Sequence, residues 1–250
     1  MTGDSLRSVI LTGFPSGFAA TNCFIAAGAA GGDCVIVDPG QNALEPALSL
    51  AAEHELRPVA ALVTHGHLDH MWSVTPLCQG AGIPAYIHPD DRHLLADPMA
   101  GVSAELKAQL TALSDGALDF HEPDDVRELT DGAVLELAGL RFTAHHAPGH
   151  TPGSIAFTLE VPDGAGVMLS GDLLFAGSIG RTDLPGGDSD QMAESLRRVC
   201  LSGPGTLDAP DEMIVLPGHG PQTSLGRERM TNPFLVGLDD GPTEWSVTGQ

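Results

Sequence analysis

The segment Thr64–His70 reads THGHLDH and follows directly on the apolar run Val59–Val63. An apolar run of this length predicts a buried strand, so three histidines and an aspartate are expected at a strand end. Strand ends that feed loops are where functional side chains are usually held on a rigid scaffold. In an extended segment, alternation would place His65, His67 and Asp69 on one side. The motif therefore predicts a metal site at the edge of a sheet.

Three later predicted strands also end at a metal-capable side chain. These are His150 after a strand ending near Ala144, Asp172 after the strand 167–170, and His219 after the strand 213–216. Imidazole and carboxylate suit zinc, iron or manganese, whereas a thiolate site would use cysteine. His65 and His67 could bind one ion, while Asp69 and His70 could bind a second. Two ions bridged by Asp172 and a water would lower the pKa of that water enough to give hydroxide at neutral pH.

Charge and composition exclude several classes of protein. The net charge of −22 repels nucleic acid and anionic lipid, so neither is expected as a partner. No stretch has 18 consecutive apolar residues, and the N-terminus lacks a basic region followed by an apolar core. We therefore expect neither a membrane span nor a secretory signal, and we predict a cytoplasmic protein. The cysteines lack a CxxC spacing, which favours buried, reduced thiols, at positions Cys23, Cys34, Cys78 and Cys200.

The order of predicted elements indicates one domain over residues 1–250. Strands are predicted at 6–12, 22–26, 34–37, 59–63, 85–88, 134–137, 141–144, 155–159, 167–170 and 213–216, and helices at 43–55, 72–79 and 188–199. Residues 90–125 are polar, acidic and helix-prone, with the best helix at 104–113, and we interpret them as a helical excursion that could cover the site. Two runs of strands with helices between favour a two-sheet α/β sandwich over a doubly wound parallel sheet.

Not every polar residue in the chain is expected to be functional. Single histidines are usually structural or exposed, and this interpretation is given to His54, His88, His93, His121, His145 and His146. Asp90 and Asp91 are expected to be solvated charges at the start of a helix. The tail from Thr231 onward is expected to become weakly ordered after Asn232-Pro233-Phe234-Leu235.

The pattern HxHxDH at 65–70, followed in order by His150, Asp172 and His219, resembles the metallo-β-lactamase superfamily. Within it, Ser170–Phe175 (SGDLLF) and Gly180–Asp183 (GRTD) resemble the short bacterial glyoxalase II-like hydrolases. The resemblance implies an αββα sandwich of two mixed sheets flanked by helices, with the metals at one edge. It assigns the first metal to His65, His67 and His150, the second to Asp69, His70 and His219, and the bridging role to Asp172. It also implies that Asp38 braces the metal loops from behind.

The chain departs from glyoxalase II proper in its length. Only 31 residues follow His219 (250 − 219), too few for the helical C-terminal domain that helps to bind glutathione in that family. Arg181 matches the family's basic position beside the thiol conjugate, so it is a candidate carboxylate anchor for the substrate. The alternative for Arg181 is a structural salt bridge with Asp183 or Asp188.

The resemblance implies a thioesterase that acts on hydroxyacyl-thiol conjugates through a hydroxide bridging two divalent metal ions. Zinc is the expected metal, with iron or manganese as alternatives, and Asp69 and Asp172 are the expected catalytic carboxylates. A second interpretation is a persulfide dioxygenase with one iron on His65, His150 and Asp172. A third is a non-catalytic member that binds a metal or a partner. The sequence leaves open the thiol and whether the chain is a monomer or a homodimer.

Overall fold

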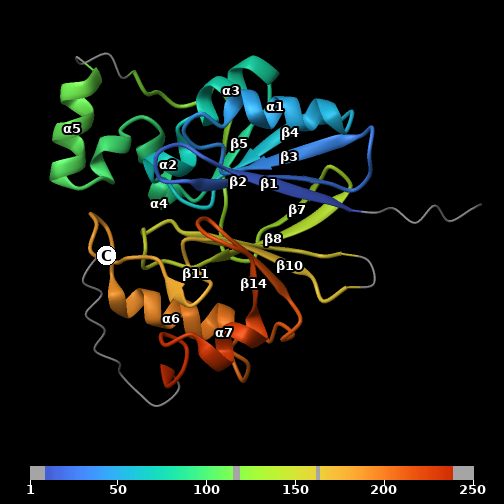
Figure 1. Ribbon diagram of the computed structural model, residues 1–250, viewed down its shortest axis with the longest axis vertical. Helices are drawn as coiled ribbons and strands as arrows, with labels where there is room; N and C mark the ends of the chain where they lie inside the picture. The colour runs from blue at the N-terminus through green and yellow to red at the C-terminus, as the bar shows by residue number, and fades with distance from the viewer. Residues whose placement is uncertain (1–8, 115–118, 162–163, 239–250) are drawn as a thin grey trace, which may run out of the picture.

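Two β-sheets pack face to face at the centre of the molecule, and helices cover the outer face of each (Figure 1). The computed structural model describes residues 9–114, 119–161 and 164–238. Each sheet has six strands and contains both parallel and antiparallel pairs. The layer order confirms the predicted αββα sandwich of two mixed sheets. Within the described part of the chain, no helix combines the length and the apolar character needed to cross a membrane.

The first sheet takes its strands in chain order: β1 (Ile10–Ser16), β2 (Thr21–Ala27), β3 (Asp33–Val37), β4 (Arg57–Leu62), β5 (Ala85–Ile87) and β6 (Val126–Glu128). The first three strands pair antiparallel, and β3 to β6 pair parallel. Parallel neighbours need a crossover, which α1 (Leu44–Glu53) supplies after β3 and α3 (Val74–Ala81) after β4. The carboxyl ends of β3 and β4 therefore meet at one edge, which carries the THGHLDH segment.

The second sheet has the order β14-β13-β10-β9-β8-β7. Its strands are β7 (Val134–Leu137), β8 (Leu140–His146), β9 (Ile155–Leu159), β10 (Val167–Gly171), β13 (Ile214–Pro217) and β14 (Thr223–Ser224). Strands β7 and β8 form a hairpin, whose turn residues Ala138 and Gly139 both have positive φ. Helix α6 (Ser189–Cys200) begins at Asp188, whose side chain accepts hydrogen bonds from the backbone amides of Asp190 and Gln191.

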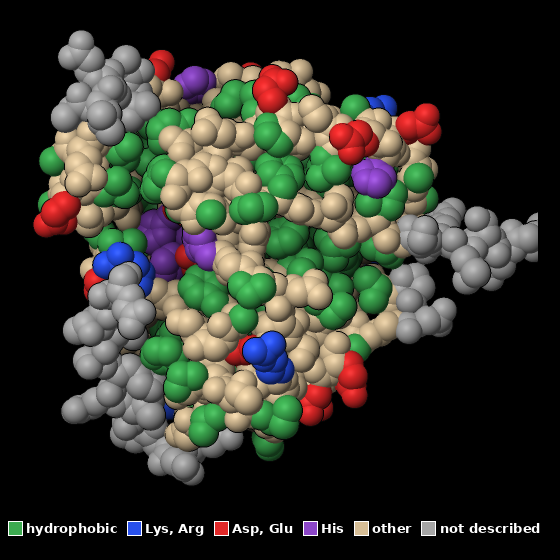
Figure 2. Space-filling view, viewed as in Figure 1, with side chains coloured by type: hydrophobic (Ala, Val, Ile, Leu, Met, Phe, Trp, Pro, Cys, Tyr) green, Lys and Arg blue, Asp and Glu red, His purple; other side chains and the backbone are tan. Residues whose placement is uncertain are grey.

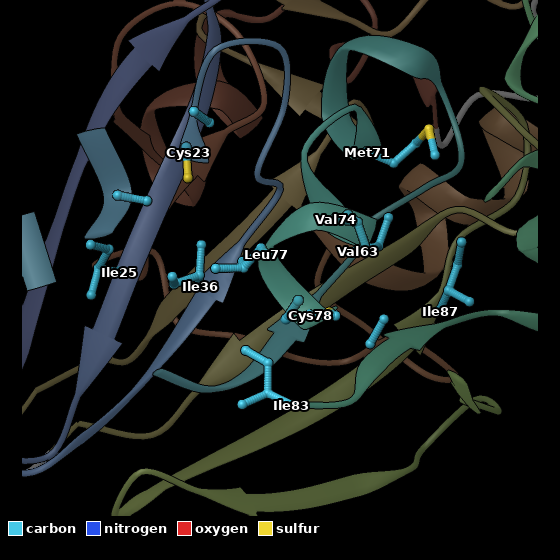
Figure 3. Close-up of a cluster of buried hydrophobic side chains, with 14 of the residues drawn as sticks. Cys23, Ile25, Ile36, Val63, Met71, Val74, Leu77, Cys78, Ile83 and Ile87 are labelled. Atoms are coloured by element: carbon cyan, nitrogen blue, oxygen red, sulfur yellow. The ribbon is translucent and has the colours of Figure 1, made fainter. Parts of the chain in front are cut away.

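Three buried clusters fill the spaces between these layers. The largest side chains between the two sheets include Phe142, Phe157 and Leu62. A second cluster lies under α1 and α3, where Ile36 of β3 approaches Leu77 of α3 (Figure 3). A third cluster joins α6 to the second sheet and to the short strands β11 (Leu174–Phe175) and β12 (Ser178–Ile179). The four cysteines are buried, as predicted.

The segment after β5 leaves the first sheet as a series of short helices, in the region around 90–125 that is interpreted from the sequence as a helical excursion. The helices are α4 (Pro89–Arg92), two 3₁₀ turns at His93–Leu95 and Pro98–Ala100, and α5 (Ala104–Ser114). Residues 115–118 of that region lie outside the described residues. Figure 1 shows α5 standing beside the first sheet at the edge toward which α2 and α4 also lie. The chain then returns to the first sheet as β6, a strand that was not predicted.

Two predictions near the ends of the chain need correction. The first strand occupies residues 10–16 rather than 6–12, and residues 6–8 lie outside the described residues. Helix α7 (Leu225–Thr231) was not predicted, and the segment after it is anchored because Asn232, Leu235 and Leu238 are buried. The side-chain amide of Asn232 donates to the backbone oxygen of Ser178 at 3.0 Å, which ties the tail to β12. Residues 239–250 lie outside the described residues.

Candidate metal centre

The structure brings all seven predicted ligand residues to one edge of the sandwich. Their side-chain nitrogen and oxygen atoms form three overlapping groups in which all atoms lie within 4.8 Å of one another: His65, His67 and His150; His65, His70 and Asp172; and Asp69, His70 and His219. The residues come from the loops that follow β4, β8, β10 and β13. Strands far apart in sequence therefore deliver their carboxyl-terminal loops to a single place.

The THGHLDH segment is not extended throughout, which corrects the predicted alternation. His67 has an extended backbone, with ψ of 143°, but the helical turn α2 (Leu68–Met71) begins at the next residue. Successive helical residues rotate by about 100° around the axis, so Asp69 and His70 leave the side shared by His65 and His67. Both approach His219 instead, and His70 also stays close to His65, so it belongs to two of the three groups.

Asp172 lies between the two halves of the site, which are formed by His65, His67 and His150 and by Asp69, His70 and His219. Its carboxylate oxygens are 3.3 Å from His70 Nε2, 3.4 Å from His150 Nε2 and 3.5 Å from His219 Nε2. The side chain is buried, and a Cβ added at Gly218 would lie 2.3 Å from its Oδ1. Glycine is therefore required beside this carboxylate, because any other residue would occupy the space between it and His70.

Four of the histidines are held in place by a partner at Nδ1. The contacts are His65 to Thr64 Oγ1 (3.1 Å), His70 to Asp38 Oδ2 (2.9 Å), His150 to the Arg181 backbone oxygen (2.7 Å) and His219 to the Ala19 backbone oxygen (3.2 Å). A carbonyl or carboxylate oxygen only accepts, so Nδ1 of His70, His150 and His219 donates the proton, and Nε2 of each ring faces Asp172. Outer hydrogen bonds of this kind orient metal-ligating histidines in proteins.

Asp38 controls one histidine in each half of the site. Its Oδ1 accepts from the Thr64 amide at 2.8 Å, and its Oδ2 accepts from Thr64 Oγ1 at 2.7 Å and from His70 Nδ1 at 2.9 Å. Because the Thr64 hydroxyl donates to Asp38, its oxygen is left to accept from His65. The buried Asp38 thus fixes His70 directly and His65 through Thr64, at the position where the sequence predicts a brace.

Asp91 is a functional candidate that the sequence analysis missed. It was expected to be solvated, but it is fully buried, whereas the neighbouring Asp90 is exposed. Its Oδ2 accepts from the Gly66 amide at 2.8 Å and from Thr151 Oγ1 at 2.7 Å, and its Oδ1 accepts from the Gly153 amide at 2.7 Å. Asp91 therefore ties the loop that carries His65 and His67 to the loop that carries His150. Two adjacent aspartates at a helix start gave no sign of which one points inward.

The charges in the site favour a cation at its centre. Burial and the neighbouring His150 lower the pKa of His67 to about 3, so this ring stays neutral. Burial opposes charge on His70 and His219 as well, but Asp172 and Asp69 outweigh it, raising the pKa of His70 and bringing that of His219 to about 9. The buried carboxylates thus demand positive charge beside them, which a divalent cation would also supply.

Orphaned polar atoms point to the same conclusion. Among the described residues, three buried side-chain atoms have no hydrogen-bond partner, and all belong to the predicted ligands: His65 Nε2, His67 Nε2 and Asp172 Oδ1. Leaving such atoms unpaired costs free energy, so each needs a partner that protein groups do not provide. The donor set of imidazole nitrogens and carboxylate oxygens fits zinc, iron or manganese.

Arg181 forms the alternative contact that the sequence left open. Its guanidinium pairs with Asp183 through two hydrogen bonds, Nε to Oδ1 at 2.6 Å and Nη2 to Oδ2 at 2.7 Å. The backbone oxygen of Arg181 has a separate role, because it accepts the hydrogen bond from His150 Nδ1. The side chain is therefore engaged, although it still borders the cavity above the site.

A cavity of about 790 Å³ opens over Asp69, His150, Asp172 and His219. One wall comes from the helical excursion, through Gly101, Val102, Ser103 and Leu106, and the opposite wall from the segment around β11 and β12. Figure 2 shows histidine side chains in a hollow at the edge of the molecule, with basic and hydrophobic side chains beside them. The volume is large enough for a small-molecule substrate.

The remaining histidines lie outside this cluster. His88, Asp90 and His146 form another close group, in which the two imidazole rings stack at 3.9 Å with an angle of 4° between their planes. Lone pairs of parallel stacked rings run parallel rather than converging, and His146 Nε2 already donates to the Pro152 backbone oxygen at 2.8 Å. This group is better explained as a packing contact than as a metal site.

Comparison with known sequences agrees with this geometry. A family model described as the metallo-beta-lactamase superfamily matches residues 16–219. An uncharacterised protein of Mycobacterium leprae is 45% identical over 92% of this chain and 100% of its own length. The hydroxyacylglutathione hydrolase GloC of Haemophilus influenzae is 34% identical over 81% of this chain and 87% of its own length.

Two solved structures resemble the whole fold. BLEG-1, a B3 metallo-beta-lactamase, superposes with a TM-score of 0.75 at 33% identity and covers 91% of this chain and 100% of its own. TTHA1623, solved in a di-iron-bound form, superposes with a TM-score of 0.69 at 37% identity and covers 90% of this chain and 100% of its own.

Proposed function

The chain belongs to the metallo-beta-lactamase superfamily, and on this premise we propose that it is a metal-dependent thioesterase acting on hydroxyacyl-thiol conjugates. One relative, GloC, bears the name hydroxyacylglutathione hydrolase, and the Gly180–Asp183 segment resembles the same group of hydrolases. The substrate is a small molecule that enters the cavity over the site.

The observation that carries the proposal is the position of Asp172, whose carboxylate oxygens lie 3.3 Å from His70 Nε2 and 3.4 Å from His150 Nε2, among the overlapping groups of candidate ligands. We propose that His65, His67 and His150 would hold one divalent ion and that Asp69, His70 and His219 would hold a second, with Asp172 available to both. Zinc is the first candidate, with iron or manganese as alternatives. Bound ions of this kind act as Lewis acids and make water a hydrolytic nucleophile at neutral pH.

The chain's own residues position the reactants. Asp69 Oδ2 accepts from Thr21 Oγ1 at 2.7 Å and lies 3.3 Å from His219 Nε2, which fixes this carboxylate at the floor of the cavity. We propose that Asp69 orients the attacking water toward the thioester carbonyl. The leaving thiolate has a pKa of about 8.5, so it departs without a dedicated general acid.

Hydrolysis of S-lactoyl-N-acetylcysteamine and S-lactoylglutathione, followed as loss of the thioester absorbance, tests the proposal. Metal-loaded protein is expected to cleave at least one of them. Loss of an outer partner of a ligand costs about 10–100-fold, so Asp172→Asn is expected to cost at least as much in kcat. Asp90→Asn, at an exposed carboxylate, is the matched control and should keep the activity.

Two results would overturn the proposal. Cleavage of neither thioester by protein with full metal content is one, and wild-type activity in Asp172→Asn is the other. A chromogenic β-lactam is run beside the thioesters, because the fold is shared with BLEG-1. Cleavage of the lactam alone would replace the thioesterase by a lactam hydrolase that uses the same site.

A further inference from the structure

The cavity above the metal centre is walled mainly by apolar side chains. Val102 and Leu106 come from the helical excursion, Phe175 and Ile179 from β11 and β12, and Phe18 and Phe234 from two other segments. Phe18 is 55% exposed, which is unusual for a large hydrophobic side chain and leaves it free to contact a ligand at the rim. The parts of a substrate that flank the reacting bond therefore meet hydrocarbon over most of their surface.

Apart from the histidines of the candidate metal site, the cavity is lined by few basic side chains. Among the residues that the structure describes around the cavity, Arg181 is the only lysine or arginine. The single lysine of the chain, Lys107, is exposed on α5 and does not line the cavity. A carboxylate on the substrate, away from the metal centre, would therefore have Arg181 as its one charged partner among the lysine and arginine side chains of this described lining.

Arg181 is already paired with Asp183. The two parallel hydrogen bonds of 2.6 Å and 2.7 Å use the Nε and Nη2 donors, the edge with which a guanidinium binds a carboxylate in fork geometry. Asp183 itself does not line the cavity, so it neutralises Arg181 from behind. A substrate carboxylate would have to displace Asp183 or accept its repulsion, and an unpaired charge against apolar walls is costly.

We propose that Asp183 is a specificity-determining residue, which masks the one arginine of the cavity and thereby selects thioesters of neutral, largely apolar thiols over thiols that carry carboxylates. This inference rests on the proposed function in that it names the substrate class of the same site. It assigns the selectivity to charge on the thiol arm, and a tripeptide thiol with two free carboxylates is the disfavoured case.

Binding of two uncleavable ligands with the same skeleton tests this inference. S-hexyl-N-acetylglutathione carries two carboxylates, and its diethyl ester is neutral; both are thioethers. Isothermal titration of metal-loaded protein is expected to give the ester the lower Kd by at least about tenfold, because an unpaired carboxylate is poorly tolerated against apolar walls. Asp183→Asn frees Arg181 and should reduce that ratio by about two- to fivefold, as expected for a half-exposed ion pair.

Asp33→Asn is the matched control. Asp33 forms an exposed pair with Arg57 at 2.7 Å, at the start of β3, away from the cavity. The Asp33→Asn variant loses the same unit of negative charge as Asp183→Asn, so it controls for the effect of the overall charge of −22 on the binding of an anionic ligand. The ratio of the two Kd values should stay at the wild-type value in this variant.

The outcomes separate this inference from the proposed function. Equal affinities, tighter binding of the dianion, binding of neither ligand, or an unchanged ratio in Asp183→Asn would each overturn the inference. None of these results depends on hydrolysis. Absence of thioester cleavage together with a clear preference for the ester would instead overturn the thioesterase and leave the charge selectivity of the cavity standing.

Discussion

Oδ2 of Asp38 lies 2.9 Å from Nδ1 of His70, and both side chains are buried at the edge where β3 and β4 end. The same carboxylate oxygen accepts from Thr64 Oγ1, which in turn contacts His65. One acid therefore sets the ring orientation and the protonated nitrogen of a histidine in each half of the metal centre. This arrangement links the brace to the whole site rather than to a single ligand.

Replacing Asp38 by asparagine should weaken metal binding without unfolding the protein. Asp38 has a positive φ of 50°, a conformation that asparagine tolerates. An amide cannot accept all the bonds that the carboxylate accepts, so His70 or Thr64 loses its partner. We expect the metal affinity to fall by about 10–100-fold, measured by competition with a chromogenic chelator. Asp33→Asn, at the exposed start of the same strand, is the control, and equal affinities in the two variants would refute the role of Asp38.

Replacing Asp91 by asparagine tests the tie between the two histidine loops. Both oxygens of the Asp91 carboxylate accept hydrogen bonds from the surrounding loops. In asparagine, one of these oxygens becomes an NH₂ group, which would place its own N–H groups against a donor of the loops. We expect the metal-free protein to lose about 1–3 kcal/mol of unfolding free energy in urea. The neighbouring Asp90→Asn should change it by less than about 0.5 kcal/mol, because Asp90 is exposed. Similar losses in both variants would mean that Asp91 has no special part.

Two glycines provide a matched pair for backbone packing. A Cβ at Gly40 would lie 1.8 Å from the Asp69 backbone oxygen, whereas one at Gly80 in α3 would meet open space. Gly40→Ala should displace α2 and destabilise the protein by about 1–3 kcal/mol. Gly80→Ala should stabilise it by about 0.5–1 kcal/mol, since alanine favours the helix. Thermal unfolding of both variants measures the difference, and two variants of equal stability would contradict the tight approach.

Removing the metal should lower the thermal stability of the protein, because the carboxylates of the candidate site, such as the buried Asp172, would lose a positive charge beside them. An ion that binds only the folded chain adds about 2.7 kcal/mol when its free concentration is 100 times its Kd. Thermal unfolding before and after dialysis against a chelator should therefore show a fall in Tm, and adding back the divalent ion should reverse it. A Tm that does not respond to the ion would show that the seven residues are satisfied without it.

Local patterns predicted the fold, and the seven residues predicted as ligands do lie together at one edge of it. The apolar runs that became β4, β10 and β13 placed their following polar residues at one edge, because buried strands end where loops begin. His150 was expected near that edge because it follows the strand ending near Ala144, and Asp38 was expected there on the basis of the family resemblance. The layer order followed from two runs of strands separated by helices.

Features that depend on tertiary contacts were not predictable. Asp91 and Asp90 are adjacent and chemically alike, and only the packing of α4 against two loops buries one of them. The pairing of Arg181 with Asp183 was one of two alternatives for that arginine, and a single sequence could not choose between them. Strand β6 is only three residues long and is placed by its neighbour β5 rather than by its own pattern.

The measurement that tests the central claim most directly is the metal content of protein purified without a metal-binding tag, by elemental analysis against quantitative protein concentration. The seven candidate ligands, with Asp172 between His70 and His150, predict about two divalent ions per chain. A single iron per chain, with oxygen uptake in the presence of a thiol persulfide, would contradict the two-ion hydrolase and favour a dioxygenase.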